Sequence, residues 1–198
     1  QLWRHTRLQT SFPVNMLALD HGKPKQMGLI EILNAFIDFR FEVVTRRTKF
    51  LLNKARNRAH ILAGLMVAIT SIDEIIELIK SSSDPESARN LLCSKSWPAK
   101  EVESFINLID DPSHQIIDGA YKLSILQAKA ILELRLQRLT GMERNKLEKE
   151  TEELSQQINE HLILLSDKSK LTNLIQTELD EVLKRIDDPR RTEINDSA

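Results

Sequence analysis

The chain has 198 residues, of which 41% are hydrophobic and 29% charged, with only five glycines and six prolines. These proportions are typical of a helical protein with one or two domains. No uncharged apolar run reaches 18 residues, which excludes a membrane-spanning helix. The single cysteine, Cys93, excludes an intrachain disulfide and fits a reducing compartment, so we expect a cytoplasmic protein. Because the sequence starts at Gln1 without a methionine or signal segment, we also expect a fragment.

Charge is distributed unevenly along the chain, although the total is only −1. Residues 1–60 carry eleven lysines and arginines against four acids, which gives this part a net charge of +7. Such an asymmetry favours a polyanionic partner for the N-terminal part, with a solvated helix face as the alternative. The densest basic run, residues 45–49, is of the kind that helices present to phosphates without reading sequence.

The first 26 residues differ from the rest of the chain. Residues 2–12 predict a short helix that Pro13 ends. Residues 14–19 alternate like a strand, and residues 20–24 have turn chemistry. One helix and part of a hairpin cannot form a core, so we expect this piece to belong to a larger domain.

Two long stretches, residues 29–69 and 147–186, share one apolar rhythm with alternating steps of four and three residues. This is the heptad spacing of a coiled coil. At 1.5 Å per residue each arm would be roughly 60 Å long. Two matched arms joined by a compact segment predict an antiparallel coiled-coil hairpin with a small helical domain at its tip. The expected contact stripes are Leu29, Leu33, Phe36, Arg40, Val43, Arg47, Leu51, Ala55, Arg58, Leu62, Leu65 and Ile69 in arm one, and Leu147, Thr151, Leu154, Ile158, His161, Leu165, Lys168, Thr172, Ile175, Leu179, Val182 and Ile186 in arm two.

Polar residues on these stripes leave two points open. Arg40, Arg47 and Arg58 either face phosphate or pair with acids of the second arm such as Glu178 and Asp180. The polar stretch 166–170 predicts a break in arm two.

Short helices are expected between the arms. Ser71 with Glu74 reads as a capping box for a helix to residue 80, and Asp84 with Pro85 marks a cleaner start. Residues 97–108 predict a further helix, and Ser124 begins a helix that runs to residue 139.

The helix over residues 124–139 is apolar on two sides. One face holds Ile125, Ala128, Leu132, Leu136 and Leu139, and the opposite face holds Leu126, Ala130, Ile131 and Leu134. Such a helix must be buried on both sides. Either both faces are internal, or the second face contacts an identical tip across a two-fold axis. The candidate dimer-interface residues are therefore Leu126, Ala130, Ile131 and Leu134.

No motif for catalysis is present. The sequence lacks a P-loop, a dinucleotide fingerprint and an H-E-x-x-H motif, and its five histidines are scattered without ligand spacing. Tyr121, the only tyrosine, has Lys122 beside it but no convergent set of groups that would make it a nucleophile. We predict no catalytic, cofactor or metal residue. On charge and periodicity alone, an RNA-binding coiled-coil arm is the alternative to a dimeric gate.

Five segments resemble the breakage-reunion part of the A subunit of DNA gyrase, in the family's order and with plausible spacing. They are IDFRFEVVTRRTKF (37–50), KARNRAHILAGLMVAI (54–69), IDEIIELIKSS (72–82), QAKAILELRLQRLTGMERNKLE (127–148) and DPRRTEI (188–194). The A subunit of topoisomerase IV shares much of this pattern. The segment from Trp97 to Tyr121 and the ending RRTEI favour gyrase.

The resemblance implies the end of a tower domain at 1–27, coiled-coil arms at 28–70 and 142–187, an exit-gate dimerisation domain at 71–141, and a return to the tower at 188–198. The implied partners are a second copy, the B subunit of gyrase and double-stranded DNA, with no membrane. ATP and Mg²⁺ would act through the B subunit, and the fragment would be inactive alone. Basic residues implied to lie near DNA are Arg4, Arg7, Lys23, Lys25, Arg46, Arg47 and Lys49.

Overall fold

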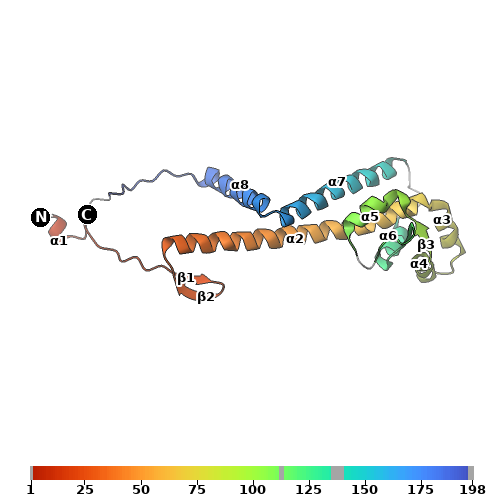
Figure 1. Cartoon of the computed structure of the whole chain (residues 1–198), viewed down its shortest axis with the longest axis horizontal. Helices are drawn as coiled ribbons and strands as arrows, with labels where there is room; N and C mark the ends of the chain where they lie inside the picture. The colour runs from red at the N-terminus through yellow and green to blue at the C-terminus, as the bar shows by residue number, and fades with distance from the viewer. Residues whose placement is uncertain (1, 112–113, 135–140, 196–198) are drawn as a thin grey trace. The chain divides into compact units, whose positions relative to one another are not determined.

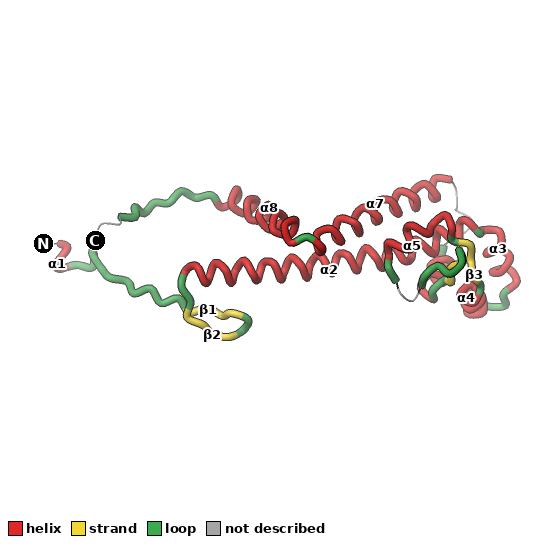
Figure 2. Tube along the Cα trace, viewed as in Figure 1, coloured by secondary structure: helices red, strands yellow, loops and turns green. Residues whose placement is uncertain are grey.

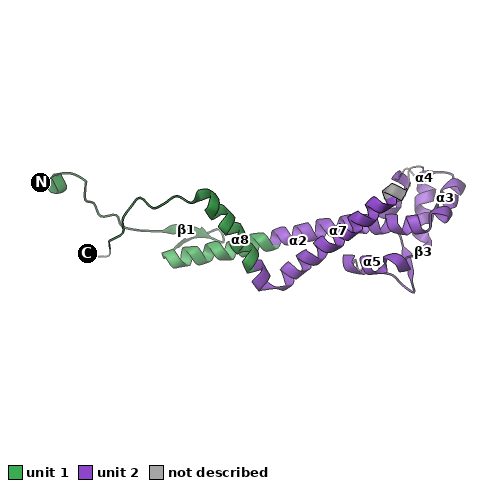
Figure 3. Cartoon of the chain, turned by 90° about the horizontal axis from the view of Figure 1, so that it is seen from above, with its two compact units in different colours: residues 1–45, 172–198 green, residues 46–171 purple. Residues whose placement is uncertain are grey.

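The computed structural model describes residues 2–111, 114–134 and 141–195 and is dominated by helices (Figures 1 and 2). The expected mainly α-helical class is therefore confirmed. The chain divides into two compact units, residues 1–45 with 172–198 and residues 46–171 (Figure 3). No helix in the described ranges is long and apolar enough to cross a membrane.

The first unit begins with a helix that is shorter than expected. Helix α1 covers only Leu2–His5, whereas the sequence pattern predicted a helix to residue 12. Strands β1 (Leu17–Asp20) and β2 (Lys23–Gln26) then pair antiparallel, with Leu17 opposite Gln26. The two residues between them, His21 and Gly22, have φ of 48° and 77°. Positive φ at both positions is the signature of the tight hairpin turn that matches the twist of the strands.

Two long helices contribute to this unit. Helix α2 spans Leu29–Thr70 without interruption, as expected for arm one, and helix α8 spans Lys168–Ile186. Within the first unit, Arg40 Nη2 donates a hydrogen bond of 2.8 Å to Glu178 Oε2. This contact confirms the pairing of Arg40 with an acid of the second arm.

The contact stripe of α2 differs from the expected one by a single residue over much of its length. Between residues 44 and 62 the buried positions are Val44, Thr48, Leu52, Ala55, Ala59 and Leu62, and beyond them Leu65 is buried as expected. Ala55 and Leu62 were expected, but Arg47, Leu51 and Arg58 are exposed. The periodicity favoured Leu51 because it continues the four-three spacing, whereas the buried face of α2 includes the small side chains of Thr48 and Ala59.

The second unit contains most of the short elements. They are helices α3 (Ile72–Ser81), α4 (Pro85–Ser94), α5 (Glu103–Ile109) and α6 (Ile125–Glu133), the 3₁₀-helix η1 (Lys100–Val102), strands β3 (Ser96–Pro98) and β4 (Ala120–Lys122), and the long helix α7 (Gly141–Ser166). β3 and β4 pair antiparallel with Trp97 opposite Tyr121. The core combines side chains of α2, the small elements and α7: Leu62, Leu92, Trp97, Tyr121, Ile131 and Ile158.

The local signals at Ser71, Asp84 and Ser124 predicted the starts of α3, α4 and α6 correctly, whereas the helix start predicted at Trp97 is wrong. Asp84 accepts from the Ser87 amide at 2.7 Å with Pro85 in the first turn, and Ser124 with Gln127 forms a full capping box. Ser71, in contrast, makes no side-chain cap bond. The helix expected over residues 97–108 begins later than predicted: Trp97 lies in β3, the chain turns helical at η1, and α5 forms the remainder. The Trp97 indole enters the core and donates to the Leu92 carbonyl at 3.0 Å.

The predicted break in arm two is confirmed. α7 ends at Ser166 and α8 begins at Lys168, and the Asp167 carboxylate accepts from the Ser169 amide at 2.8 Å. Because Asp167 caps α8, it also marks the end of α7. The polar stretch therefore determines where the two helices meet.

Candidate functional site: the polar network between α2 and α6

A buried glutamine joins α6 to α2 in the second unit. Gln127 is fully buried, and its Nε2 donates to the His60 carbonyl at 2.6 Å and to the Tyr121 hydroxyl at 2.8 Å. Its Oε1 accepts from the Ser124 amide at 2.9 Å. Both Nε2 and Oε1 of the side chain therefore have hydrogen-bond partners. Burial of this amide leaves no unpaired polar atom, and the paired network is rigid.

The approach of α6 to α2 requires a glycine on α2. A Cβ atom on Gly64 would lie 2.6 Å from Gln127 Cγ and 2.7 Å from Gln127 Cβ. These separations are well below van der Waals contact, so only a residue without a side chain fits here.

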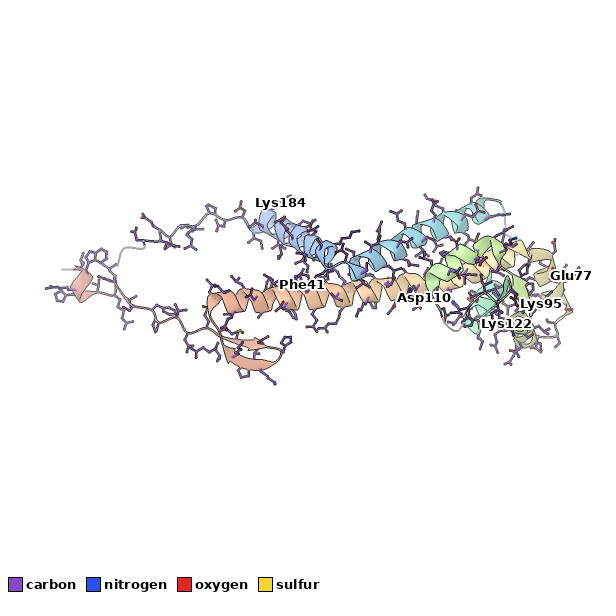
Figure 4. All side chains as sticks on the ribbon, viewed as in Figure 1. Phe41, Glu77, Lys95, Asp110, Lys122 and Lys184 are labelled. Carbon is purple, nitrogen blue, oxygen red and sulfur yellow. The ribbon has the colours of Figure 1, made fainter. Side chains whose placement is uncertain are left out.

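Three ligand-type side chains gather on the solvent side of this network. His60, on α2, places Nδ1 3.5 Å from Asp111 Oδ2, and His114 places Nδ1 3.1 Å from the same oxygen. The two imidazole rings meet edge to face with centroids 5.2 Å apart. All three residues are half-buried. Asp110, labelled in Figure 4, ends α5 in the left-handed conformation with φ of 54°, and this reversal sets the direction of the following aspartate.

The environment shifts two ionisable groups of the network. Burial, together with the nearby His114, lowers the pKa of His60 below its usual 6.5, although Asp111 opposes the change. The His60 ring is therefore neutral at pH 7. Burial raises the pKa of Tyr121 above 10, so its phenol is protonated and acts as a hydrogen-bond partner of Gln127.

The cluster opens onto a groove that also reaches the start of α6. Its lining includes Asn57, His60, Asp111, His114 and Leu126. Ile125 and Leu126 are each 65% exposed, although they stand in the first turn of a helix whose other side is buried. The groove is thus polar along its α2 side and apolar along its α6 side.

The candidate interface residues are not all on the surface. Leu126 is exposed and Ala130 and Leu134 are half-buried, but Ile131 is fully buried in the core of its own chain. The buried stripe of α6 contains Gln127, Ala128 and Ile131, and so takes residues from both of the expected faces. α6 also ends at Glu133, with Leu134 already extended, rather than at residue 139. Leu136 and Leu139 lie outside the described residues.

The basic candidates fall in both units and are all exposed. Arg4, Arg7, Lys23 and Lys25 belong to the first unit, and Arg46, Arg47 and Lys49 belong to the second. Within each unit they are surface side chains, as phosphate contacts require.

Sequence spacing gave no sign of the His60 cluster or of the Gln127 network. The two histidines are far apart in the chain, and no motif links them. The one local signal was the capping box of Ser124 and Gln127, which fixes the turn from which the network grows.

Comparison with known proteins gives consistent matches over the whole chain. The family model for the A subunit of DNA gyrase/topoisomerase IV matches residues 1–180. The DNA gyrase A subunit of Granulibacter bethesdensis is 46% identical over 197 residues, and that of Rickettsia bellii is 46% identical over 194. The Aeromonas salmonicida protein of the same name is 44% identical over 206 residues. These matches cover 98% to 100% of this chain, which spans only about a fifth of the length of each relative (21% to 22%).

Proposed function

Because the chain belongs to the family of DNA gyrase and topoisomerase IV A subunits, we propose that it is the coiled-coil and exit-gate segment of a gyrase. The whole enzyme would negatively supercoil DNA by ATP-dependent passage of one duplex through another. This segment would join two copies through the small elements between α3 and α6 and open to release the transported duplex. It would supply no catalytic residue, and ATP and Mg²⁺ would be used through the B subunit in the cytoplasm. The names of the relatives favour gyrase over topoisomerase IV.

The exposed apolar start of α6 carries this proposal. Ile125 and Leu126 stand side by side in solvent, each 65% exposed, on a helix fixed by a capping box and by the Gln127 network. Burying a leucine side chain is worth roughly 1.5 to 3 kcal/mol relative to leaving it exposed. A rigid apolar pair of this kind suits an isologous contact, in which each copy covers the same patch of the other.

The exposed basic residues support a role close to DNA. Their positions on a hairpin and on helix surfaces suit contacts with phosphates, which orient a protein on a duplex without reading its sequence. Such binding weakens steeply as salt increases. The proposal therefore assigns dimerisation to the second unit and contact with the duplex to the basic side chains.

Sedimentation equilibrium of the 198-residue chain tests the dimer. We expect a dimer for the unchanged chain and a monomer for Leu126→Glu. Leu183→Glu is the matched control, because Leu183 is 63% exposed on α8 and its substitution should leave the dimer intact. Circular dichroism of each variant checks that the helices remain. A chain that is monomeric at every concentration, or a Leu126→Glu variant that is folded and dimeric, would contradict the proposal.

A further inference from the structure

The strongest unassigned feature is the cluster of His60, Asp111 and His114. We infer that these three side chains form a binding site for a zinc ion. Each offers one ligand atom, and these atoms lie within 4.8 Å of one another. Imidazole nitrogen and carboxylate oxygen are zinc ligands of the usual kind, and two histidines with one carboxylate are a known ligand set. The site is independent of the proposed gate function.

The distances in the cluster fit tetrahedral coordination. Zinc binds nitrogen and oxygen at about 2.0 to 2.2 Å, so two ligands of a tetrahedron lie about 3.3 to 3.5 Å apart. The observed separations between the Asp111 oxygen and the two imidazole nitrogens are 3.5 and 3.1 Å. The distances from Asp111 Oδ2 to the two imidazole nitrogens are therefore already close to those between ligands of a tetrahedral zinc ion. The ligand atoms of the two histidines lie within 4.8 Å of each other, and rotation of the imidazole rings would close this third edge.

A hydrogen bond behind the cluster orients one of the ligands. His60 Nε2 lies 2.8 Å from Ser124 Oγ, on the side of the ring away from Asp111. Ser124 Oγ already accepts a hydrogen bond from the backbone N–H of Gln127 at 3.2 Å. Its second lone pair can accept from the His60 Nε2–H. With that proton on Nε2, the lone pair of Nδ1 points toward Asp111. Zinc-binding histidines commonly have such a partner on their second nitrogen.

The surroundings leave the zinc one open position. Three protein ligands bind the ion, and the groove bordered by Asn57 and Leu126 admits a water molecule as the fourth. Arg56 lines the same groove, but it lies 3.5 Å from the Asp110 carboxylate, which offsets its charge. Bound zinc would connect α2 with the loop after α5 and, through Ser124, with the start of α6. We therefore expect zinc to stabilise the second unit.

Calorimetric titration of the metal-free 198-residue chain with ZnCl₂ tests the inference. We expect one zinc per chain, and at least a tenfold loss of affinity in Asp111→Asn and in His114→Ala. Both residues are half-buried and lie outside the helices and strands, so the fold should persist, and fluorescence of the buried Trp97 checks it. His161→Ala is the matched control, because His161 is a half-buried histidine on α7 that should not affect binding.

Two further measurements separate this site from adventitious binding. Zinc should raise the melting temperature of the unchanged chain and of His161→Ala, but not of His114→Ala. The Co²⁺ derivative should have the visible bands of a tetrahedral ion without a thiolate charge-transfer band. A thiolate band would place the metal at Cys93 and overturn the inference. Zinc binding that is absent at micromolar concentrations, or that is equal in all variants, would overturn it as well.

Discussion

Replacing Gly64 with alanine tests the contact between α2 and α6 more directly than any other single change. The new methyl group would lie 2.6 Å from Gln127 Cγ and 2.7 Å from Gln127 Cβ. Gln127 cannot move aside without cost, because it is fully buried and hydrogen-bonded to Tyr121 and to the backbone of His60. The substitution therefore forces either the helix or the polar network to shift.

One stabilising and two destabilising contributions determine the expected change in the free energy of unfolding. In an unhindered helix, glycine to alanine would stabilise the protein by about 1 kcal/mol. Overpacking a dense core costs about 1 to 3 kcal/mol, and a buried amide that loses its partners costs about 1 to 3 kcal/mol more. We expect Gly64→Ala to lower the free energy of unfolding of the second unit by about 1 to 5 kcal/mol, the two losses less the gain in helix propensity.

Urea unfolding followed by tryptophan fluorescence measures this loss. Trp97 is fully buried in the second unit and reports on it, and Trp3→Phe removes the signal of the exposed Trp3. The expected result is a lower midpoint with an unchanged m-value. In a Gln127→Gly background the same Gly64→Ala change should be neutral or stabilising, because the obstructing atoms are absent. A chain stabilised by Gly64→Ala alone would refute the close approach of the two helices.

Two further predictions concern charged groups. The pKa of Asp84 is lowered from 3.8 by hydrogen bonds from the Ser87 amide and hydroxyl, so its contribution to stability is complete above pH 3.8 and is lost as the pH falls through the lower folded value. Near neutral pH the unchanged chain should therefore have a larger free energy of unfolding than Asp84→Asn, and this difference should disappear in acid. A difference that stays constant with pH would contradict this. Arg58 binds Glu150 through two hydrogen bonds of 2.7 and 3.0 Å, but the Arg58 side chain is 51% exposed and that of Glu150 is 36% exposed. Glu150→Gln should therefore cost less than about 1 kcal/mol in urea unfolding, and less still in high salt.

Local chemistry was readable from the sequence wherever a signal acts within one helical turn. The side chains of Asp84, Ser124 and Asp167 each accept a hydrogen bond from a backbone amide two or three residues further along the chain. Such signals need no knowledge of the tertiary structure. Helix α3 also begins directly after Ser71 as predicted, although the Ser71 side chain makes no cap hydrogen bond.

Features that depend on distant contacts were not readable. Trp97 lies in a strand, with its indole in the core, and no local preference encodes that position. His60 and His114 come together because α5 ends in a left-handed residue and the chain returns toward α2. Gln127 appeared to be only a capping residue, yet its burial against Gly64 determines which side of α6 faces the core.

In arm one the heptad pattern and the structure select different buried positions. Substitution of two adjacent leucines, Leu51 and Leu52, tests which of them is right. The heptad pattern selected Leu51, but Leu51 is 39% exposed and Leu52 only 6% exposed. Truncating a buried leucine removes its transfer free energy and leaves a cavity, so Leu52→Ala should cost about 2 to 5 kcal/mol in urea unfolding.

Leu51→Ala is the matched control, since the residue types, the helix and the change in helix propensity are the same. It should cost less than about 1 kcal/mol, because the Leu51 side chain is already partly in water. Equal losses would mean that both leucines contact the second arm, and a larger loss at Leu51 would restore the register that the sequence pattern favoured. The difference between the two variants therefore measures which face of α2 is buried, independently of how stable the chain is as a whole.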